Sequence, residues 1–191
     1  MNNPNTQLKD LIHVERGIIP ANLCDSLVEE IEKNEWNPHS WYSEHQDSVN
    51  SYGETEPDVQ ESTSDHQNLL MPFVIQTVRE YNIKYSYLKR SVIVSKFSAL
   101  RFNRYAPGQL MLQHYDHIKS LFDGEVKGIP ILSFVLNLND DYEGAELFFW
   151  DDHVVPLGKG DIIMFPSLFL FPHGVKEATR GNRYSAVCWA V

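Results

Sequence analysis

The sequence predicts a mainly β protein, an antiparallel sandwich or barrel with helices packed on its outside. Two segments with apolar residues at helical spacing lie in the first half of the chain. From Ser91 onwards, short strand-like runs alternate with turn signals such as APG, DDYEG and GKG. The 191 residues suit one domain with a real core. We expect residues 1–90 to form a helical support region and residues 91–191 to form the β-core.

The first half contains two predicted helices. Leu11–Pro20 is typical of a short strand that ends at a proline. Asn22–Lys33 is predicted to be a helix with Asn22 as its N-cap. Its apolar stripe consists of Leu23, Leu27, Val28 and Ile31. A second helix is expected at Asn68–Asn82, with Pro72 in its first turn, where a missing N–H costs little.

The segment Ser48–Asp65, between the two predicted helices, is polar and acidic, which predicts a mobile surface loop. In the second helix, the residues expected to face inward are Leu70, Phe73, Val74, Thr77, Val78 and Tyr81. The predicted strands of the second half are 91–97, 99–105, 109–116, 129–138, 145–150, 153–157, 161–166, 168–175 and 183–191.

The composition argues against several kinds of partner. The formal net charge is −10, and such a surface repels phosphate backbones, so we expect no nucleic acid as a partner. No polybasic cluster favours binding to an anionic membrane. Cys24 and Cys188 are far apart, which favours a reducing compartment over a disulfide scaffold. The polar N-terminus lacks the apolar core of a signal peptide, so a cytoplasmic location is expected.

The stretch QHYDH, Gln113–His117, contains two histidines and an aspartate. Alternate side chains of a strand point to the same face. One face would carry Leu110, Leu112, His114 and Asp116, and the other Met111, Gln113, Tyr115 and His117. The H-x-D spacing therefore selects His114 and Asp116 as a metal-binding pair, with His117 aimed elsewhere.

A third ligand is expected at His173, which follows an apolar run and precedes a glycine. Two histidines and one carboxylate on one face of an octahedral metal form the facial triad of non-haem Fe(II) oxygenases. The alternative is that the H-x-D pair consists of polar residues on the surface and that His173 is an ordinary hydrogen-bonded histidine. Arg183, ten residues further on, can point into the β-core. A buried guanidinium is costly unless paired, and a dicarboxylate would pair with it.

These motifs together resemble the Fe(II)- and 2-oxoglutarate-dependent dioxygenase superfamily, and within it the prolyl 4-hydroxylase-like group. RYAPGQLMLQHYD is similar to that group's R-Y-x-x-G-Q-x-x-x-x-H-x-D run. LNLNDDYEGAELFFW and GKGDIIMFP are similar to its hairpin and to a following strand, and HGVKEATRGNRYSAVCW to its closing segment. The resemblance covers Ser91–Val191.

The resemblance implies a double-stranded β-helix (jelly-roll) core. It implies that Fe(II) is bound by His114, Asp116 and His173. Arg183 would bind the distal carboxylate of 2-oxoglutarate, and Tyr105 and Trp189 would line its pocket. The alternatives are an ordinary aromatic residue at a strand end for Tyr105 and an equally favoured role in core packing for Trp189. The implied reaction uses O₂, releases succinate and CO₂, and hydroxylates prolyl residues of a protein or peptide, with ascorbate as a candidate reductant.

Three positions depart from the group's pattern. Collagen-type prolyl hydroxylases of animals and plants have lysine where Arg183 stands, and Met111 and Ala145 replace a frequent tyrosine and a glycine. The departures leave the substrate open. The alternatives are a hydroxylase of a free amino acid or another small molecule, and a non-catalytic β-barrel binding module. The oligomeric state is left open as well.

Overall fold

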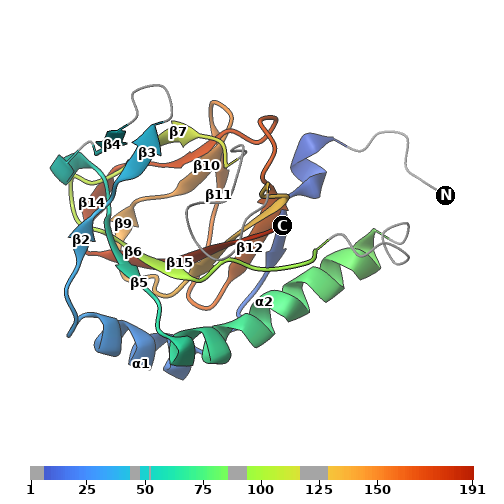
Figure 1. Ribbon diagram of the computed structural model, residues 1–191, viewed down its shortest axis with the longest axis horizontal. Helices are drawn as coiled ribbons and strands as arrows, with labels where there is room; N and C mark the ends of the chain where they lie inside the picture. Colours follow the sequence, from blue (N-terminus) through green and yellow to red (C-terminus); the bar gives the residue numbers. More distant parts are fainter. Residues whose placement is uncertain (1–6, 44–47, 52, 86–93, 117–128) are drawn as a thin grey trace.

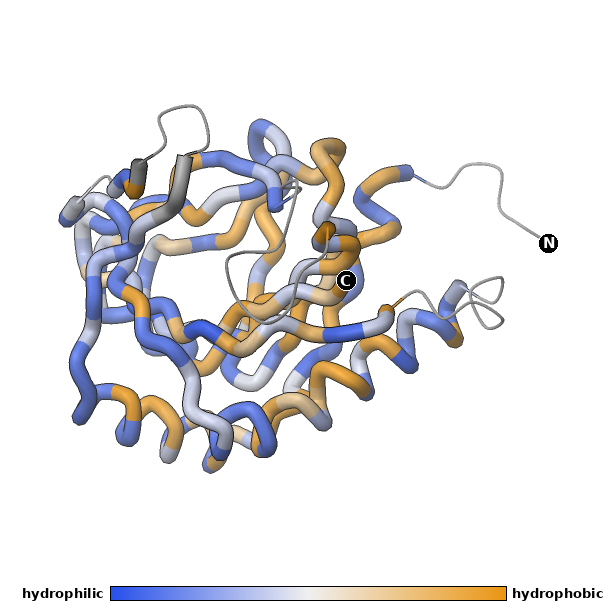
Figure 2. Tube along the Cα trace, in the orientation of Figure 1, coloured by the Kyte–Doolittle hydropathy of each residue, from blue (hydrophilic) through white to orange (hydrophobic). Residues whose placement is uncertain are grey.

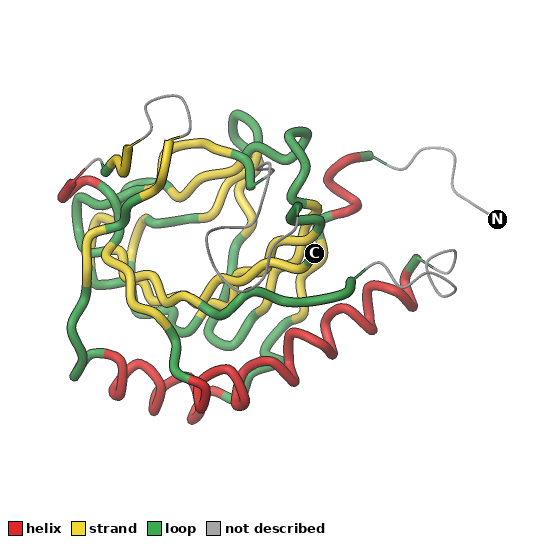
Figure 3. Tube along the Cα trace, in the orientation of Figure 1, coloured by secondary structure: helices red, strands yellow, loops and turns green. Residues whose placement is uncertain are grey.

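Two antiparallel sheets packed face to face, with two helices on the outside, make up the described part of the protein. The computed structural model describes residues 7–43, 48–51, 53–85, 94–116 and 129–191. A seven-stranded sheet forms the middle layer, with the helices on one face and a four-stranded sheet on the other (Figure 1). Figure 3 shows the strands gathered on one side of the two long helices. The predicted mainly β class with flanking helices is confirmed.

All neighbouring strands of the two sheets are antiparallel. The seven-stranded sheet contains, in order, β1 (His13–Glu15), β12 (Ile162–Pro166), β8 (Leu132–Asn137), β15 (Arg183–Ala190), β6 (Arg101–Tyr105), β5 (Asp58–Glu61) and β2 (Asn37–Pro38). The four-stranded sheet contains β11 (His153–Val155), β10 (Leu147–Phe149), β13 (His173–Val175) and β7 (Met111–His114). Two ribbons complete the set: β14 (Ala178–Arg180) with β9 (Glu143–Gly144), and β3 (Trp41–Ser43) with β4 (Ser48–Asn50).

The central strands β8 and β15 are covered on both faces. Their alternate residues pack under the helices: Phe134, Leu136, Tyr184, Ala186, Cys188 and Ala190. The intervening residues face the second sheet: Ser133, Val135, Asn137, Arg183, Ser185, Val187 and Trp189. Because a strand presents its side chains alternately, the same two strands build the hydrophobic core and the wall of an internal cavity.

The helices form where predicted, with different ends. α1 spans Ala21–Ile31 and begins after Pro20, without a side-chain cap, so the expected N-cap at Asn22 is wrong. α2 spans Ser64–Lys84 and is capped by Thr63, which places Pro72 inside the helix and not in its first turn. Both helices show hydrophobic and hydrophilic residues alternating along their length (Figure 2). Short 3₁₀ turns occur at Leu8–Leu11 (η1) and Gly53–Thr55 (η2).

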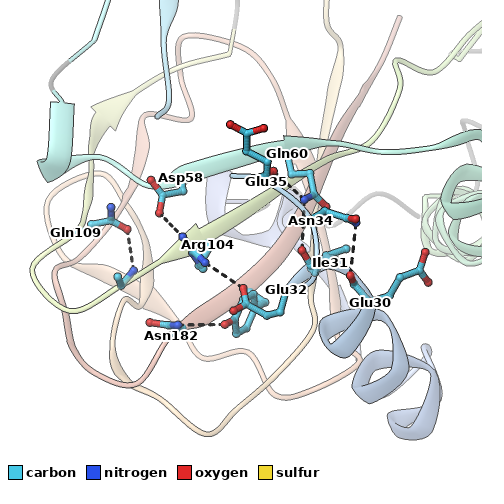
Figure 4. Close-up of polar contacts among 12 residues, drawn as sticks. Glu30, Ile31, Glu32, Asn34, Glu35, Asp58, Gln60, Arg104, Gln109 and Asn182 are labelled. Carbon is cyan, nitrogen blue, oxygen red and sulfur yellow. Dashed lines mark hydrogen bonds and ion pairs between the residues drawn. The ribbon is translucent and has the colours of Figure 1, made fainter. Parts of the chain in front are cut away.

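The expected loop Ser48–Asp65 is wrong for the described residues, because it contains β4, η2 and β5. Strand β5 pairs with β6 along its whole length. Its polar side chains have partners: Arg104 bridges Asp58 and Glu32, and the Gln60 amide donates to main-chain carbonyl groups at the end of α1 (Figure 4). Strand pairing and polar contacts thus order a segment that has little apolar character.

Several predicted strands are shorter than expected. Strand β13 contains only His173–Val175, because the preceding residues form a turn in which Leu168, Phe169 and Leu170 are exposed. Of the predicted strand 91–97, the first three residues lie outside the described part, and Phe97 makes only an isolated bridge to Ala190. No helix among the described residues is long and apolar enough to span a membrane.

The N-terminal strand β1 is attached to the core through the buried carboxylate of Asp161. This side chain accepts hydrogen bonds from Arg16 Nη1 (2.6 Å), from the Gly17 amide (2.7 Å) and from the Gly158 amide (2.8 Å). It therefore joins the turn after β1 to the turn before β12.

We expect Asp161→Ala to lower the free energy of unfolding by about 2–4 kcal/mol, because two amides lose their acceptor and the Arg16 guanidinium loses its ion pair and keeps only the carbonyl oxygen of Pro156. Urea unfolding followed by circular dichroism measures the change. Asp151→Ala is the matched control, since Asp151 lies exposed in a turn. Equal stability of the two variants would contradict this role of Asp161.

Candidate metal centre

A cavity of about 50 Å³ lies between the inner faces of the two sheets, and three potential metal ligands meet in its wall. His114 is the last residue of β7, Asp116 follows two residues later, and His173 begins β13. One ligand atom from each of the three lies within 4.8 Å of the others. β7 and β13 are adjacent strands in which His114 and His173 are paired directly. The predicted convergence of these side chains is therefore present in the fold.

Both histidines present the same nitrogen to the aspartate. The ring Nδ1 of His114 lies 2.8 Å from the carbonyl oxygen of Leu112, and that of His173 lies 3.0 Å from the carbonyl oxygen of Phe171. A carbonyl oxygen only accepts, so each Nδ1 carries a proton, and in the neutral form of each ring Nε2 has the free lone pair. The Nε2 atoms lie 3.5 and 3.7 Å from the two oxygens of Asp116. This arrangement suits a cation bound by two imidazoles and one carboxylate.

A chain of two serine hydroxyl groups supports the Asp116 carboxylate. Ser133 Oγ donates to Asp116 Oδ2 at 2.6 Å, and its own oxygen lies 2.7 Å from Ser167 Oγ. Because a carboxylate only accepts, the Ser133 proton goes to Asp116, and Ser167 donates to Ser133. Both serines are buried. The chain of hydroxyl groups therefore fixes the orientation of the carboxylate before any cation binds.

The charges of the three side chains are coupled. Burial alone would raise the pKa of Asp116, but the charge of His173 and the contact with His114 outweigh it, and the pKa lies well below its usual range. Burial lowers the pKa of His173. Burial also acts against a charged His114, but its contact with Asp116 outweighs this and raises the pKa. The cluster thus offers a carboxylate, a neutral imidazole and an imidazole whose proton a cation can replace.

The face assignment predicted for β7 is partly wrong. Met111 lines the cavity with His114 and Asp116, whereas Leu112, expected on that face, is 50% exposed. The cause is a register shift between β7 and β13. The three-residue step from Met111 to His114 lies opposite the two-residue step from His173 to Val175. Tyr115 is exposed as expected for the other face. His117 and the turn that follows it lie outside the described residues.

Arg183 lies in the same cavity with part of its guanidinium unpaired. The side chain is 1% exposed, and its Nε donates to Asn137 Oδ1 at 3.0 Å. Its Nη2 is buried and has no hydrogen-bond partner among the described residues. Tyr105 is buried directly across the β6–β15 pair, with its ring 5.6 Å from the guanidinium carbon. A buried, partly unsatisfied guanidinium favours an anion as its missing partner.

Trp189 and Arg101 complete the cavity wall at the other end of β15. The guanidinium carbon of Arg101 lies 5.7 Å from the Trp189 ring centroid. Sequence reasoning missed Arg101, Ser133 and Ser167. The spacing of Arg101 and Tyr105 on one strand, four residues apart, could have indicated Arg101, since both then share a face. No local signal singles out the two serines, because their roles depend on how distant strands pair.

Comparisons with known proteins agree with this geometry. Residues 100–191 match the family model described as the 2OG-Fe(II) oxygenase superfamily. A PKHD-type hydroxylase of Stenotrophomonas maltophilia is 36% identical over 99 residues, which cover 49% of this chain and 43% of the relative. One of Caulobacter vibrioides is 38% identical over 96 residues, with coverages of 46% and 40%. The match thus spans less than half the length of these curated relatives.

Solved structures share the fold over almost the whole chain. A Pseudomonas putida prolyl-4-hydroxylase has a TM-score of 0.65 at 21% identity, covering 94% of this chain and 91% of the other. The viral collagen prolyl hydroxylase of Paramecium Bursaria Chlorella virus-1, solved with 2-oxoglutarate, has a TM-score of 0.64 at 16% identity, covering 94% of each. The predicted double-stranded β-helix and the predicted family resemblance are confirmed.

We expect Ser133→Ala to weaken the binding of a divalent metal ion about 10- to 100-fold, because the Asp116 carboxylate loses the donor that orients it. Anaerobic calorimetric titration with Fe(II) measures the dissociation constant. Ser185→Ala is the control, since its hydroxyl lines the same cavity without a hydrogen-bond partner in the described part of the chain. An equal loss of affinity in both variants would contradict an orienting role of Ser133.

Proposed function

We propose that this protein is an Fe(II)- and 2-oxoglutarate-dependent hydroxylase, on the premise that its residues 100–191 belong to the 2OG-Fe(II) oxygenase superfamily. The observation that carries the proposal is one cavity that contains both a His–Asp–His cluster and a buried, partly unpaired arginine. A non-catalytic binding module has no need to place all four groups together. The family implies Fe(II), 2-oxoglutarate and O₂.

The residues present fit this set of ligands. In the proposal, His114, Asp116 and His173 hold Fe(II), because their free Nε2 atoms and a carboxylate oxygen converge. When bound, iron and 2-oxoglutarate together activate O₂, so that one oxygen atom enters a substrate C–H bond and the other enters succinate as CO₂ is released. The protein's own groups bind, orient and shield these reactants.

Arg183 is proposed to bind the distal carboxylate of 2-oxoglutarate. Its Nε is fixed by Asn137, which leaves the forked end of the guanidinium for a bidentate contact. Tyr105 packs against the guanidinium and would bound the pocket for the cosubstrate. A direct contact of Trp189 with 2-oxoglutarate stays a prediction, since this residue lies six positions further along β15 from Arg183.

Prolyl residues of a protein or peptide are the proposed substrate. A related fold is that of a Trichoplax adhaerens prolyl hydroxylase in complex with a hypoxia inducible factor peptide fragment, at 14% identity and a TM-score of 0.65. In this chain, apolar side chains close in sequence to the candidate ligands are exposed: Phe169, four residues before His173, is 63% exposed, and Tyr115, next to Asp116, is 52% exposed. Exposed apolar residues that form a group mark binding surfaces, and such a surface would suit an extended peptide.

We expect Asp116→Ala to abolish both iron binding and the formation of succinate from 2-oxoglutarate, because two imidazoles alone hold Fe(II) poorly. Succinate release and a +16 Da product from a library of proline-containing peptides, with iron and ascorbate present, are measured by mass spectrometry. Asp151→Ala should retain both activities. Full turnover by the Asp116 variant would overturn the assignment of the metal site. Hydroxylated products from free amino acids alone would show that the substrate is a free amino acid and not a peptide.

We expect Arg183→Ala to raise the concentration of 2-oxoglutarate needed for half-maximal turnover about 10- to 100-fold, because a charge-assisted bidentate contact is lost. The dissociation constant for Fe(II) should stay unchanged. Arg183→Lys keeps the charge but not the forked guanidinium, so its requirement for 2-oxoglutarate should lie between those of the unaltered protein and the alanine variant. If the alanine variant needs no more 2-oxoglutarate than the unaltered protein, a cation other than Arg183 binds the cosubstrate.

A further inference from the structure

Arg101 is a second arginine of the cavity, and the proposed reaction leaves it without a role. On β6, Arg101, Asn103 and Tyr105 share the inward face, and all three line the cavity with His114 and Asp116. Arg101 pairs with Val187 across the β6–β15 ladder, whereas Tyr105 pairs with Arg183. The two arginines thus stand four residue pairs apart, about 13 Å at their Cα atoms.

Arg101 occupies the metal end of this wall. Its guanidinium lies over Trp189, and Trp189 is paired with Ser133, the serine that holds Asp116. The charge of Asp116 acts on Arg101, and the charge of Arg101 acts on His114. The cavity therefore has one cation at the end proposed for the cosubstrate and another beside the proposed metal ligands.

The guanidinium of Arg101 has no carboxylate partner in the described part of the protein. Its Nε donates to Asn103 Oδ1 at 3.2 Å, and no aspartate or glutamate there forms an ion pair with it. Burial lowers the pKa of Arg101, and the charges of Tyr105 and of the carboxylates around it offset this only in part. A partly buried arginine that lacks its counter-ion is costly, so a ligand that supplies an anion would be favoured.

The neighbouring arginine on the same strand, Arg104, has a guanidinium that is paired with carboxylates. Arg104 faces the opposite side of the sheet, where it contacts Asp58 at 2.8 Å and Glu32 at 3.2 Å (Figure 4). It also lies over the ring of Trp36. Arg101 has the aromatic ring and one polar contact, but among the described residues it has no carboxylate within ion-pair distance. An acidic group of a ligand in the cavity would supply that partner.

We propose that Arg101 binds a carboxylate of the substrate beside the metal, so that the protein selects substrates with an acidic group close to the carbon that is hydroxylated. The proposal rests on the proposed hydroxylase function and narrows its substrate. Such a carboxylate belongs either to an acidic residue next to the proline of a peptide or to a free amino acid. Planar, bidentate pairing explains why an arginine stands at this position.

The test uses anaerobic protein loaded with Fe(II) and 2-oxoglutarate, in which binding is measured by calorimetry without turnover. Two matched pairs of probes separate the sources: a capped alanyl-prolyl-aspartate tripeptide against its asparagine counterpart, and L-proline against L-prolinamide. In one pair, the acid should bind at least about tenfold more tightly than the amide. Arg101→Met should remove this preference and Arg101→Lys should keep part of it.

Arg180→Met is the charge-matched control, because its side chain is 74% exposed and it changes the net charge equally. It should keep the preference of the unaltered protein. The proposal is overturned if the unaltered protein prefers neither acid, or if the preference survives Arg101→Met. Arg101→Lys keeps the test valid should the methionine variant not fold.

A second measurement separates the substrate from the cosubstrate. In succinate formation without added substrate, Arg101→Met should raise the requirement for 2-oxoglutarate far less than Arg183→Ala does. An equal rise in both variants would assign Arg101 to the cosubstrate and overturn the proposal. Absence of succinate formation by the unaltered protein would instead contradict the proposed function itself.

Discussion

The burial of β8 and β15 on both faces is the constraint on which the rest of the structure depends. Alternate residues of these strands face the helices and form an apolar core, while the residues between them face the second sheet. The inward set contains Ser133, which orients Asp116, and Arg183, whose guanidinium is fixed by Asn137. A shift of one residue in either strand would exchange the two sets. The hydrophobic packing of one face therefore holds the register that the cavity requires.

The cavity has a charge balance opposite to that of the whole chain. The formal net charge is −10, yet the cavity wall contains two arginines and one carboxylate, apart from the histidines. The carboxylate is already engaged by Ser133 and by both imidazoles, so it does not neutralise either guanidinium directly. Two guanidinium groups that have no carboxylate partner among the described residues make the cavity suitable for anionic ligands, and a bound cation would further offset Asp116.

Prediction from the sequence succeeded where a local pattern determines the structure, and it failed where contacts with distant residues determine it. The two helices follow from their apolar stripes, and the meeting of His114, Asp116 and His173 follows from residue type and spacing. Ser48–Asp65 has no apolar alternation, and only pairing with β6 and contacts to Arg104 and α1 make part of it a strand. The inner position of Pro72 follows from a helix start at Thr63, where capping outweighs the proline signal.

The order of residues along the chain was sufficient for the fold class, for the three converging ligand side chains and for the buried Arg183. These features depend on periodicity, on turn signals and on side-chain chemistry, all of which are local. Tertiary structure alone decided that Met111 and not Leu112 faces the cavity, that Ser133 and Ser167 support Asp116, and that no carboxylate of the described residues pairs with Arg101. Each of these depends on the register between strands far apart in sequence, and hydrogen-bonded pairing across a sheet leaves no mark in either strand alone.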